Sequence, residues 1–233
     1  MAQRDLRPNT LPWIVGKIVL TILFHGYLRM AVEGADNVPS TGSFLLVSNH
    51  LSNLDPFAIG IACHRKVHFL GKQEIFRIPV LSYFIRQWGA IPLDRDATDV
   101  AAMRVAVKVI RQGEILGIFP EGTRSSDGEL RRFREGAAKI ALRFGLPIIP
   151  VAVSGTRAAL PRGAWFIRPV PIRLRFGPPL ELAPLARPQS QPAALPAAAE
   201  RIRARIAGLL QEGESASPTR FQSVLVGLLR GRV

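Results

Sequence analysis

Apolar runs and amphipathic stretches alternate along most of the chain, and this alternation predicts its secondary structure. Short runs rich in β-branched residues predict buried strands, whereas apolar residues spaced three and four positions apart predict helices. The predicted strands cover residues 29–34, 44–47, 67–70, 89–93, 114–119, 146–154 and 171–176, and the predicted helices cover 56–62, 75–88, 99–113, 135–144 and 202–210. Strands that alternate with helices predict a single α/β domain with a mainly parallel or mixed sheet covered by helices.

The most apolar part of the chain runs from Leu11 to Leu28. As a helix it is about 27 Å long at ~1.5 Å per residue, slightly shorter than the ~30 Å hydrocarbon core of a bilayer. Lys17, Thr21 and His25 recur every fourth residue and form a narrow polar stripe. This pattern favours a helix in the membrane interface, or one packed on the protein with one side in lipid, over a transmembrane helix or a soluble core helix. We therefore expect a membrane-associated protein, monotopic or single-pass, on the cytoplasmic face of the inner membrane.

A second amphipathic pattern lies at the C-terminus, beyond a linker at 213–216. Apolar residues recur there at helical spacing between Phe221 and Leu229, with arginines at both ends. Such a basic amphipathic helix is either a second membrane contact or a helix packed on the domain. The expected organisation is a membrane-associating segment at 1–28, a main domain at 29–212, and a linker with an amphipathic helix at 213–233.

The charge balance restricts the classes of partner. The chain carries 31 Lys and Arg against 17 Asp and Glu, a net charge of +14, which favours an anionic partner. Nucleic acid is disfavoured, because aromatic residues are only 7% of the chain and nucleic-acid motifs are lacking. An anionic membrane surface or a phosphorylated substrate fits better. The single cysteine, Cys63, excludes an intramolecular disulfide.

The first candidate for chemistry is His50, in the sequence NHLSNLDP between a predicted strand and a predicted helix. A tight strand-to-helix loop can hold a reactive side chain in the open. Asp55 follows after four residues, and its carboxylate can fold back onto one imidazole nitrogen, leaving the other as a proton acceptor. The alternative is a loop histidine beside an aspartate that only caps the helix.

The second candidate is FPEGTRS, at the end of the strand predicted over 114–119. Free backbone amides around Gly122 and Thr123, together with the Arg124 guanidinium, can hold a phosphate. A turn with a surface ion pair is the alternative. Cys63, His64 and His68 superficially resemble metal ligands, but no further matched pair of ligands supports a metal site.

These motifs gain specificity in combination. NHLSNLDP, GAIPLDRD with Arg95, FPEGTRS and a fourth motif around Pro150 occur in the order and approximate spacing of one family. Over residues 30–180 the chain resembles the glycerolipid acyltransferases of the 1-acylglycerol-3-phosphate acyltransferase (lysophosphatidic acid acyltransferase) type. The resemblance implies that residues 29–212 form an acyltransferase catalytic domain.

The resemblance also implies the reaction and the roles of the residues. His50, oriented by Asp55, acts as a general base on the sn-2 hydroxyl of 1-acylglycerol 3-phosphate, which attacks an acyl thioester of coenzyme A or acyl carrier protein and yields phosphatidic acid. By the same resemblance, the glycerophosphate of the acceptor is bound by Arg95, Glu121, Gly122, Thr123 and Arg124. Pro150 shapes the acyl-donor side. The expected partners are thus a lysophospholipid, an acyl thioester and an anionic membrane, with no cofactor.

Three alternatives remain open from the sequence. Another lysolipid, such as a lyso-ornithine lipid, or glycerol 3-phosphate itself is an alternative acceptor, because the four motifs do not separate these activities. A non-catalytic phospholipid-binding protein is the alternative from a different class, although intact His50, Asp55 and Glu121 argue against it.

Overall fold

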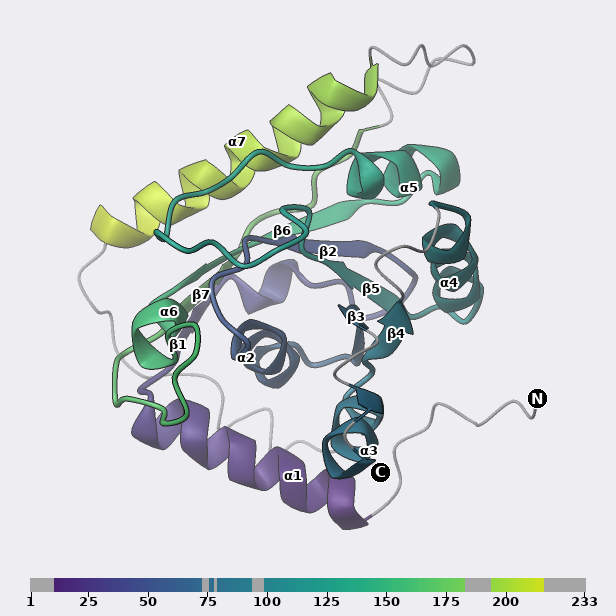
Figure 1. Ribbon diagram of the computed structural model, residues 1–233. Coiled ribbons are helices and arrows are strands. Elements are labelled where there is room, and N and C mark those ends of the chain that lie inside the picture. Colours follow the sequence, from purple (N-terminus) through teal and green to yellow (C-terminus); the bar gives the residue numbers. More distant parts are fainter. Residues whose placement is uncertain (1–10, 73–75, 78, 94–98, 183–193, 216–233) are drawn as a thin grey trace.

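The computed structural model describes residues 11–72, 76, 77, 79–93, 99–182 and 194–215 (Figure 1). Its centre is a seven-stranded sheet with the order β1-β7-β6-β2-β5-β3-β4. Neighbouring strands are parallel except for β6 and β7, which are antiparallel. The strands are β1 (Ala31–Glu33), β2 (Leu45–Ser48), β3 (Val67–Lys72), β4 (Ile91–Leu93), β5 (Ile115–Ile118), β6 (Ile148–Ser154) and β7 (Arg173–Phe176). The predicted α/β domain with a mainly parallel, mixed sheet is confirmed.

The interior strands are apolar because both of their faces are covered. Every residue of β2 is buried, as expected for the central strand of a parallel sheet. Helices α4 (Asp99–Arg111), α5 (Gly136–Phe144) and α7 (Ala194–Ser215) lie on one side of the sheet in Figure 1, whereas α2 (Asp55–Ala62) lies on the other. Each side has its own cluster of buried apolar residues. The result is a three-layer arrangement around the sheet.

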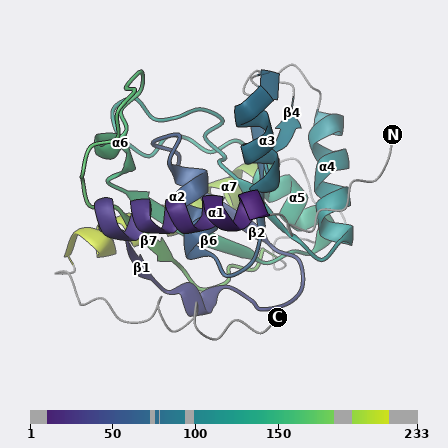
Figure 2. The same ribbon diagram turned by 90° about the horizontal axis from the view of Figure 1, so that it is seen from below.

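The N-terminal helix adds an outer element on the α2 side. It consists of α1 (Leu11–Thr21) and a π-helical continuation (Ile22–Tyr27), and Figure 2 shows it crossing in front of the sheet. Phe24 and Leu28 at its end are fully buried in the core on that side. Helix α3 (Pro79–Gln87) lies beside the start of α1 in Figures 1 and 2. The N-terminal segment therefore packs on the domain.

The polar stripe of this helix is more buried than its apolar side. Lys17 and Thr21 of the predicted polar stripe are half-buried, whereas Ile14, Ile18 and Ile22 are about half or more exposed, at 46%, 53% and 66%. The apolar side of α1 thus faces outward. Within the described part of the chain, no helix combines the length and apolar character that crossing a bilayer requires.

The parallel strands bring the predicted chemistry to one edge. The loops that follow β2, β4, β5 and β6 all leave from the carboxyl ends of parallel strands, which lie along the same edge of the sheet. The first three of these loops contain the His50, Arg95 and Glu121 motifs, respectively. The short helix α6 (Thr156–Ala159) follows β6 directly at this edge.

Candidate active site

His50 and Asp55 meet in the loop between β2 and α2. The imidazole Nδ1 lies 2.8 Å from Asp55 Oδ2. The same oxygen accepts the backbone amides of Leu51, at 2.6 Å, and Ser52, at 2.8 Å. Asp55 is completely buried in the first turn of α2, where the helix dipole favours a negative charge. One carboxylate oxygen therefore both folds the loop and orients the histidine.

This geometry sets the protonation pattern of the imidazole. Nδ1 faces a carboxylate and carries a proton, so the lone pair of the neutral ring resides on Nε2. The His50 side chain is 19% exposed, whereas Asp55 is not exposed at all. A ring that is fixed on one side and partly open on the other is suited to general-base chemistry.

The His50 ring is also held by stacking. It lies on the Phe119 ring with 4.1 Å between centroids and 17° between planes. Phe69 of β3 stacks on Phe119 in turn, with 5.1 Å between the two ring centroids. Gly117 leaves room for this column, because a Cβ there would lie 2.4 Å from a Phe69 ring carbon. The stacked rings of Phe119 and Phe69 thus fix the plane of the His50 imidazole.

Asn49 ties the same loop to the next strand. Its side-chain amide donates to the Val153 carbonyl at 2.9 Å and its carbonyl oxygen accepts the Val153 amide at 2.8 Å. The side chain is buried, and the paired bonds imitate those of a strand neighbour. The His50 loop therefore cannot shift without breaking contacts to β6.

Glu121 has a different place from that expected for a residue that holds substrate. Its side chain is 95% covered, with only 5% exposed. Oε1 accepts the backbone amide of His50 at 2.7 Å, and Oε2 accepts that of Arg131 at 3.3 Å. Burial raises the pKa of this carboxyl, against the opposing effect of these two hydrogen bonds. Both oxygens serve the fold of the site, and the predicted contact with the acceptor stays a prediction.

Gly122 forms the turn beside Glu121. Its φ is +71°, and a Cβ at this position would lie 2.9 Å from the Arg134 Nε. Its amide donates to the Phe119 carbonyl at 3.1 Å, so the expectation that this amide is free for a phosphate is wrong. Backbone closure of the turn uses it instead.

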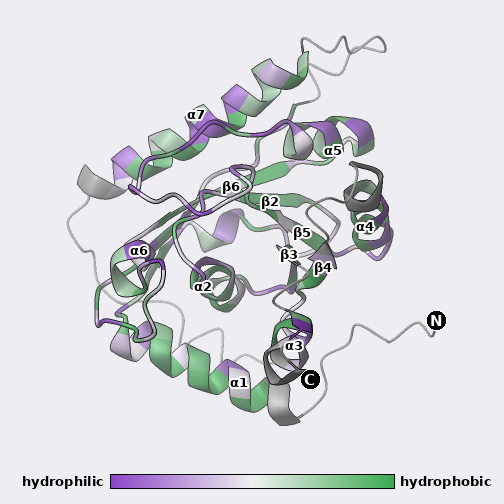
Figure 3. Ribbon diagram, viewed as in Figure 1, coloured by the Kyte–Doolittle hydropathy of each residue, from purple (hydrophilic) through white to green (hydrophobic). Residues whose placement is uncertain are grey.

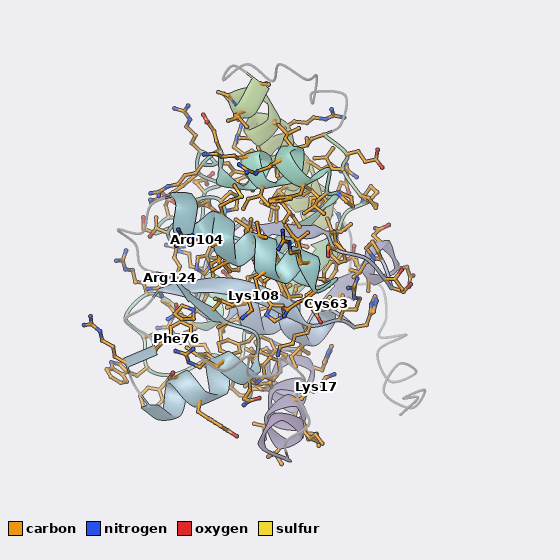
Figure 4. The ribbon with its side chains drawn as sticks, turned by 90° about the vertical axis from the view of Figure 1, so that its right-hand side faces the viewer. Lys17, Cys63, Phe76, Arg104, Lys108 and Arg124 are labelled. Carbon is orange, nitrogen blue, oxygen red and sulfur yellow. The ribbon has the colours of Figure 1, made fainter. Side chains whose placement is uncertain are left out.

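Thr123 and Arg124 are the more accessible part of this motif. Both are half-buried, and Figure 4 shows Arg124 near the border of the molecule on the side of the strands' carboxyl ends. The next residue, Ser125, donates its amide to the His50 carbonyl at 2.8 Å. The Arg124 segment and the His50 loop are therefore fastened directly to each other.

Two further residues were predicted for the site. Arg95 falls in 94–98, outside the described residues. Pro150 is buried within β6, in register with Val47, and its carbonyl accepts the Gly177 amide at 2.8 Å. The role of Pro150 on the acyl-donor side stays a prediction.

The sequence places three potential metal ligands, Cys63, His64 and His68, close together, but no metal site was expected there. Cys63 and His68 are buried, whereas His64 is exposed. Among the residues with a described position, no three His, Cys, Asp or Glu side chains come together as metal ligands would.

Sequence reasoning missed Asn49, Phe119 and the part played by Arg131. The first two stand inside the recognised motifs, beside His50 and before Glu121, and this adjacency is the only signal they carry. Arg131 contributes a backbone amide, which any residue supplies. No residue-type pattern can reveal such a contact.

Comparison with known proteins adds an independent finding. A family model described as Acyltransferase matches residues 29–154. A chloroplastic 1-acyl-sn-glycerol-3-phosphate acyltransferase of Brassica napus is 31% identical over 153 residues, which cover 64% of this chain and 44% of that protein. The corresponding enzyme of Bacillus subtilis is 29% identical over 66% of this chain and 75% of its own length. The alignment thus spans less than half of the plant relative.

A solved structure is similar as well. The crystal structure of the 1-acyl-sn-glycerophosphate (LPA) acyltransferase of Thermotoga maritima superposes with a TM-score of 0.68 at 29% sequence identity. The superposition covers 87% of this chain and 78% of that one. The likeness therefore extends beyond the four motifs to most of the fold.

Proposed function

The chain belongs to the acyltransferase family, and from this premise we propose that it transfers a fatty acyl group from an acyl thioester to the sn-2 hydroxyl of 1-acylglycerol 3-phosphate, forming phosphatidic acid. The observation that carries the proposal is the 2.8 Å contact between His50 Nδ1 and Asp55 Oδ2 beneath a partly open ring. The printed names of the relatives from Brassica napus and Bacillus subtilis support this choice of acceptor.

In the proposed mechanism, His50 Nε2 removes the proton from the acceptor hydroxyl. The oxygen attacks the thioester carbonyl, and Asp55 stabilises the imidazolium that forms. The tetrahedral intermediate then collapses, the carbon–sulfur bond breaks, and the thiolate takes the proton from His50. No acyl-enzyme is formed. A positioned general base of this kind contributes typically ~10²–10⁴-fold to the rate.

The phosphate of the acceptor is proposed to bind Arg124 and Arg95. Arg124 is supported by its position, since the adjacent Ser125 is hydrogen-bonded to the His50 carbonyl. An arginine gives a planar, two-pronged contact that suits phosphate. Arg134 is a further basic side chain beside the turn, because its guanidinium packs over Gly122.

The donor is proposed to be acyl-CoA or acyl carrier protein, with no further cofactor. Membrane attachment is proposed to rest on the N-terminal helix, whose exposed Ile14, Ile18 and Ile22 form an apolar face. The overall charge of +14 supports attraction to an anionic leaflet.

The test is acyl transfer by the purified full chain over a panel of acceptors with both donor types. Lysophosphatidic acid, a lyso-ornithine lipid and glycerol 3-phosphate cover the alternatives left open by the motifs. The expected result is highest acceptor efficiency with lysophosphatidic acid. Equal or better turnover of another acceptor overturns the assignment, and absence of transfer to all of them supports a lipid-binding role.

A further inference from the structure

Exposed apolar side chains are concentrated on one part of the molecule. Among the described residues, the large hydrophobic side chains with high exposure are Ile14, Val15, Ile18, Val19, Ile22, Tyr27, Tyr83, Trp165 and Phe166. All but Tyr83 lie on the N-terminal helix or on the loop 161–170, and Tyr83 belongs to α3, which lies beside α1. Figure 3 shows α1 as largely hydrophobic, whereas α7 on the opposite side of the sheet mixes both characters.

The loop 161–170 carries the most exposed aromatic side chains of this set. Trp165 is 93% exposed and Phe166 is 86% exposed. Adjacent aromatic residues cost free energy when they face water, because large apolar surfaces are poorly solvated. Tryptophan at the tip of a loop is typical of the membrane–water interface, where its ring is half in lipid and its N–H remains hydrated.

The loop is fastened to the end of the N-terminal helix. Tyr27 donates its hydroxyl to the Ile167 carbonyl at 3.1 Å, and Arg29 donates to the Pro169 carbonyl at 3.2 Å. The backbone closes the same junction, since the Ile172 amide donates to the Leu28 carbonyl at 3.2 Å. Figures 1 and 2 both place the loop after α6 beside this end of the helix. The two apolar elements therefore form one continuous side of the molecule.

Basic side chains flank the aromatic tip. Arg162 and Arg168 stand three residues before Trp165 and two residues after Phe166, and both are exposed, as is Arg29 at the helix end. Long basic side chains beside an apolar tip can reach lipid phosphates while the tip enters the acyl region. The combination matches an anionic lipid surface in both charge and polarity.

The loop is also connected to the candidate active site. Ser52 Oγ, two residues beyond His50, donates to the Leu160 carbonyl at 2.9 Å. Arg157 of α6 donates to the Ser126 carbonyl, two residues beyond Arg124, at 2.6 Å. The segment that leads into the loop thus contacts both motif loops.

We propose that the loop 161–170 is a second membrane anchor, in which Trp165 and Phe166 insert into an anionic bilayer alongside the outward face of the N-terminal helix. Two attached points fix the orientation of the domain, where a single helix permits rotation about its axis. The carboxyl edge of the sheet is then turned toward the lipid surface. Only this last consequence, delivery of a membrane-held acceptor to His50, rests on the proposed function.

The direct test follows Trp165 in the full chain with Trp13→Phe and Trp88→Phe, which leaves one tryptophan. Vesicles of phosphatidylcholine with phosphatidylglycerol are expected to shift its emission to the blue. Lipids brominated on the acyl chain are expected to quench it. Unchanged emission from protein that co-sediments with the vesicles overturns the proposal. A blue-shifted emission without vesicles, in protein that sediments as a dimer, assigns the loop to a second copy of the chain instead.

Variants separate the loop from general charge. Trp165→Ala with Phe166→Ala is expected to weaken vesicle partitioning about ten- to a hundredfold, from the apolar area withdrawn from lipid. Arg162→Ala with Arg168→Ala is expected to weaken binding more than Arg111→Ala with Arg201→Ala, a matched pair of exposed arginines on α4 and α7. If the two arginine pairs lose vesicle binding equally, only net charge matters and the proposed site is rejected.

Activity measurements distinguish failure of this proposal from failure of the function. The Trp165→Ala, Phe166→Ala protein is expected to keep acyl transfer to detergent-dispersed acceptor and to lose it on vesicles. Equal activity of wild type and variant on vesicles, with equal partitioning, rejects the loop as an anchor while the proposed reaction stands.

Discussion

The backbone amide of His50 donates a 2.7 Å hydrogen bond to the carboxylate of Glu121, so the two motifs of the candidate site are joined by their own residues. A return contact runs from the Ser125 amide to the His50 carbonyl at 2.8 Å. His50 is therefore held at its backbone by the loop after β5 and at its ring by Asp55 and Phe119. The position of the proposed base therefore depends on residues that follow separate strands.

Glu121→Gln tests whether this carboxylate mainly supports the loops. The amide can accept at only one of the two positions, so one backbone N–H loses its partner, at a cost of about 1–3 kcal/mol. Lower unfolding free energy and lower kcat with little change in acceptor KM are expected, measured by urea unfolding and steady-state kinetics. A rise in acceptor KM at unchanged stability indicates direct substrate contact instead.

His50→Ala is expected to reduce acyl transfer by about 10²–10⁴-fold, because it removes the proposed general base. Asp55→Asn is expected to be severely impaired too, since an amide cannot stabilise the imidazolium and leaves the 2.8 Å contact with the wrong hydrogen-bonding group. Circular dichroism and vesicle binding should remain close to wild type for His50→Ala. Near-normal turnover by this folded variant would remove His50 from the mechanism.

Gly117→Ala tests whether the stack of Phe69, Phe119 and His50 positions the imidazole. The change itself lies away from the imidazole. The added Cβ meets the Phe69 ring at 2.4 Å and must displace it, at a cost of about 1–3 kcal/mol for overpacking. Because Phe69 stacks on Phe119 and Phe119 on His50, kcat is expected to fall as well. Gly136→Ala is the control, since outside its own helix and chain neighbours no atom lies within 4 Å of its added Cβ, and it should lower neither quantity. Loss of stability at unaltered kcat contradicts a positioning role for the stack.

Periodicity predicted the sheet well because its interior strands are buried on both faces. The run Leu45–Ser48 is buried throughout, and a short apolar run between turn residues is the signal that such a strand produces. Strand order has no comparable local signal. The parallel pairing of β1 with β7 arises from contacts between segments far apart in sequence.

The candidate site was likewise only partly predictable from the sequence. His50 and Asp55 were predicted because they lie in one loop, where spacing limits the geometry. Phe119 was not, because its stacking on His50 joins two loops across the sheet. For α1, the sequence showed two faces, but their orientation depends on which face meets the core, and Phe24 and Leu28 decide it.

His68 provides a prediction for stability against pH. Burial, reinforced by the positive charges of Lys66 and Lys108, lowers its pKa from 6.5 to about 4. Below pH 6.5 the unfolded chain therefore binds a proton that the folded protein does not bind. Its contribution to unfolding free energy is complete above pH 6.5 and falls by about 1.4 kcal/mol per pH unit until about pH 4.

His68→Leu is expected to flatten this slope by about that amount, measured by urea unfolding at several pH values between 4 and 6.5. The slope is the readout, because the absolute stability of a core variant changes for other reasons. His64→Leu, at an exposed position in the same segment, should retain the wild-type slope. Identical slopes in all three proteins refute the assignment.

Arg124→Ala decides the nature of the acceptor. If Arg124 grips a phosphate, its removal costs about 1.5–3 kcal/mol, or about ten- to more than a hundredfold in acceptor efficiency. The KM for the acyl donor should change less, and Arg124→Lys should recover only part of the loss, because it keeps the charge without the planar contact.

The experiment compares two acceptors, lysophosphatidic acid and a lyso-ornithine lipid. A lyso-ornithine lipid lacks the phosphomonoester, so it should be a poor acceptor for the wild type and lose little more in Arg124→Ala. Arg143→Ala is the matched control, an exposed arginine in the last turn of α5 that should leave both acceptors unaffected. Equal losses on lysophosphatidic acid and the lyso-ornithine lipid would mean that Arg124 acts through the loop it shares with Ser125. The phosphate would then be bound elsewhere.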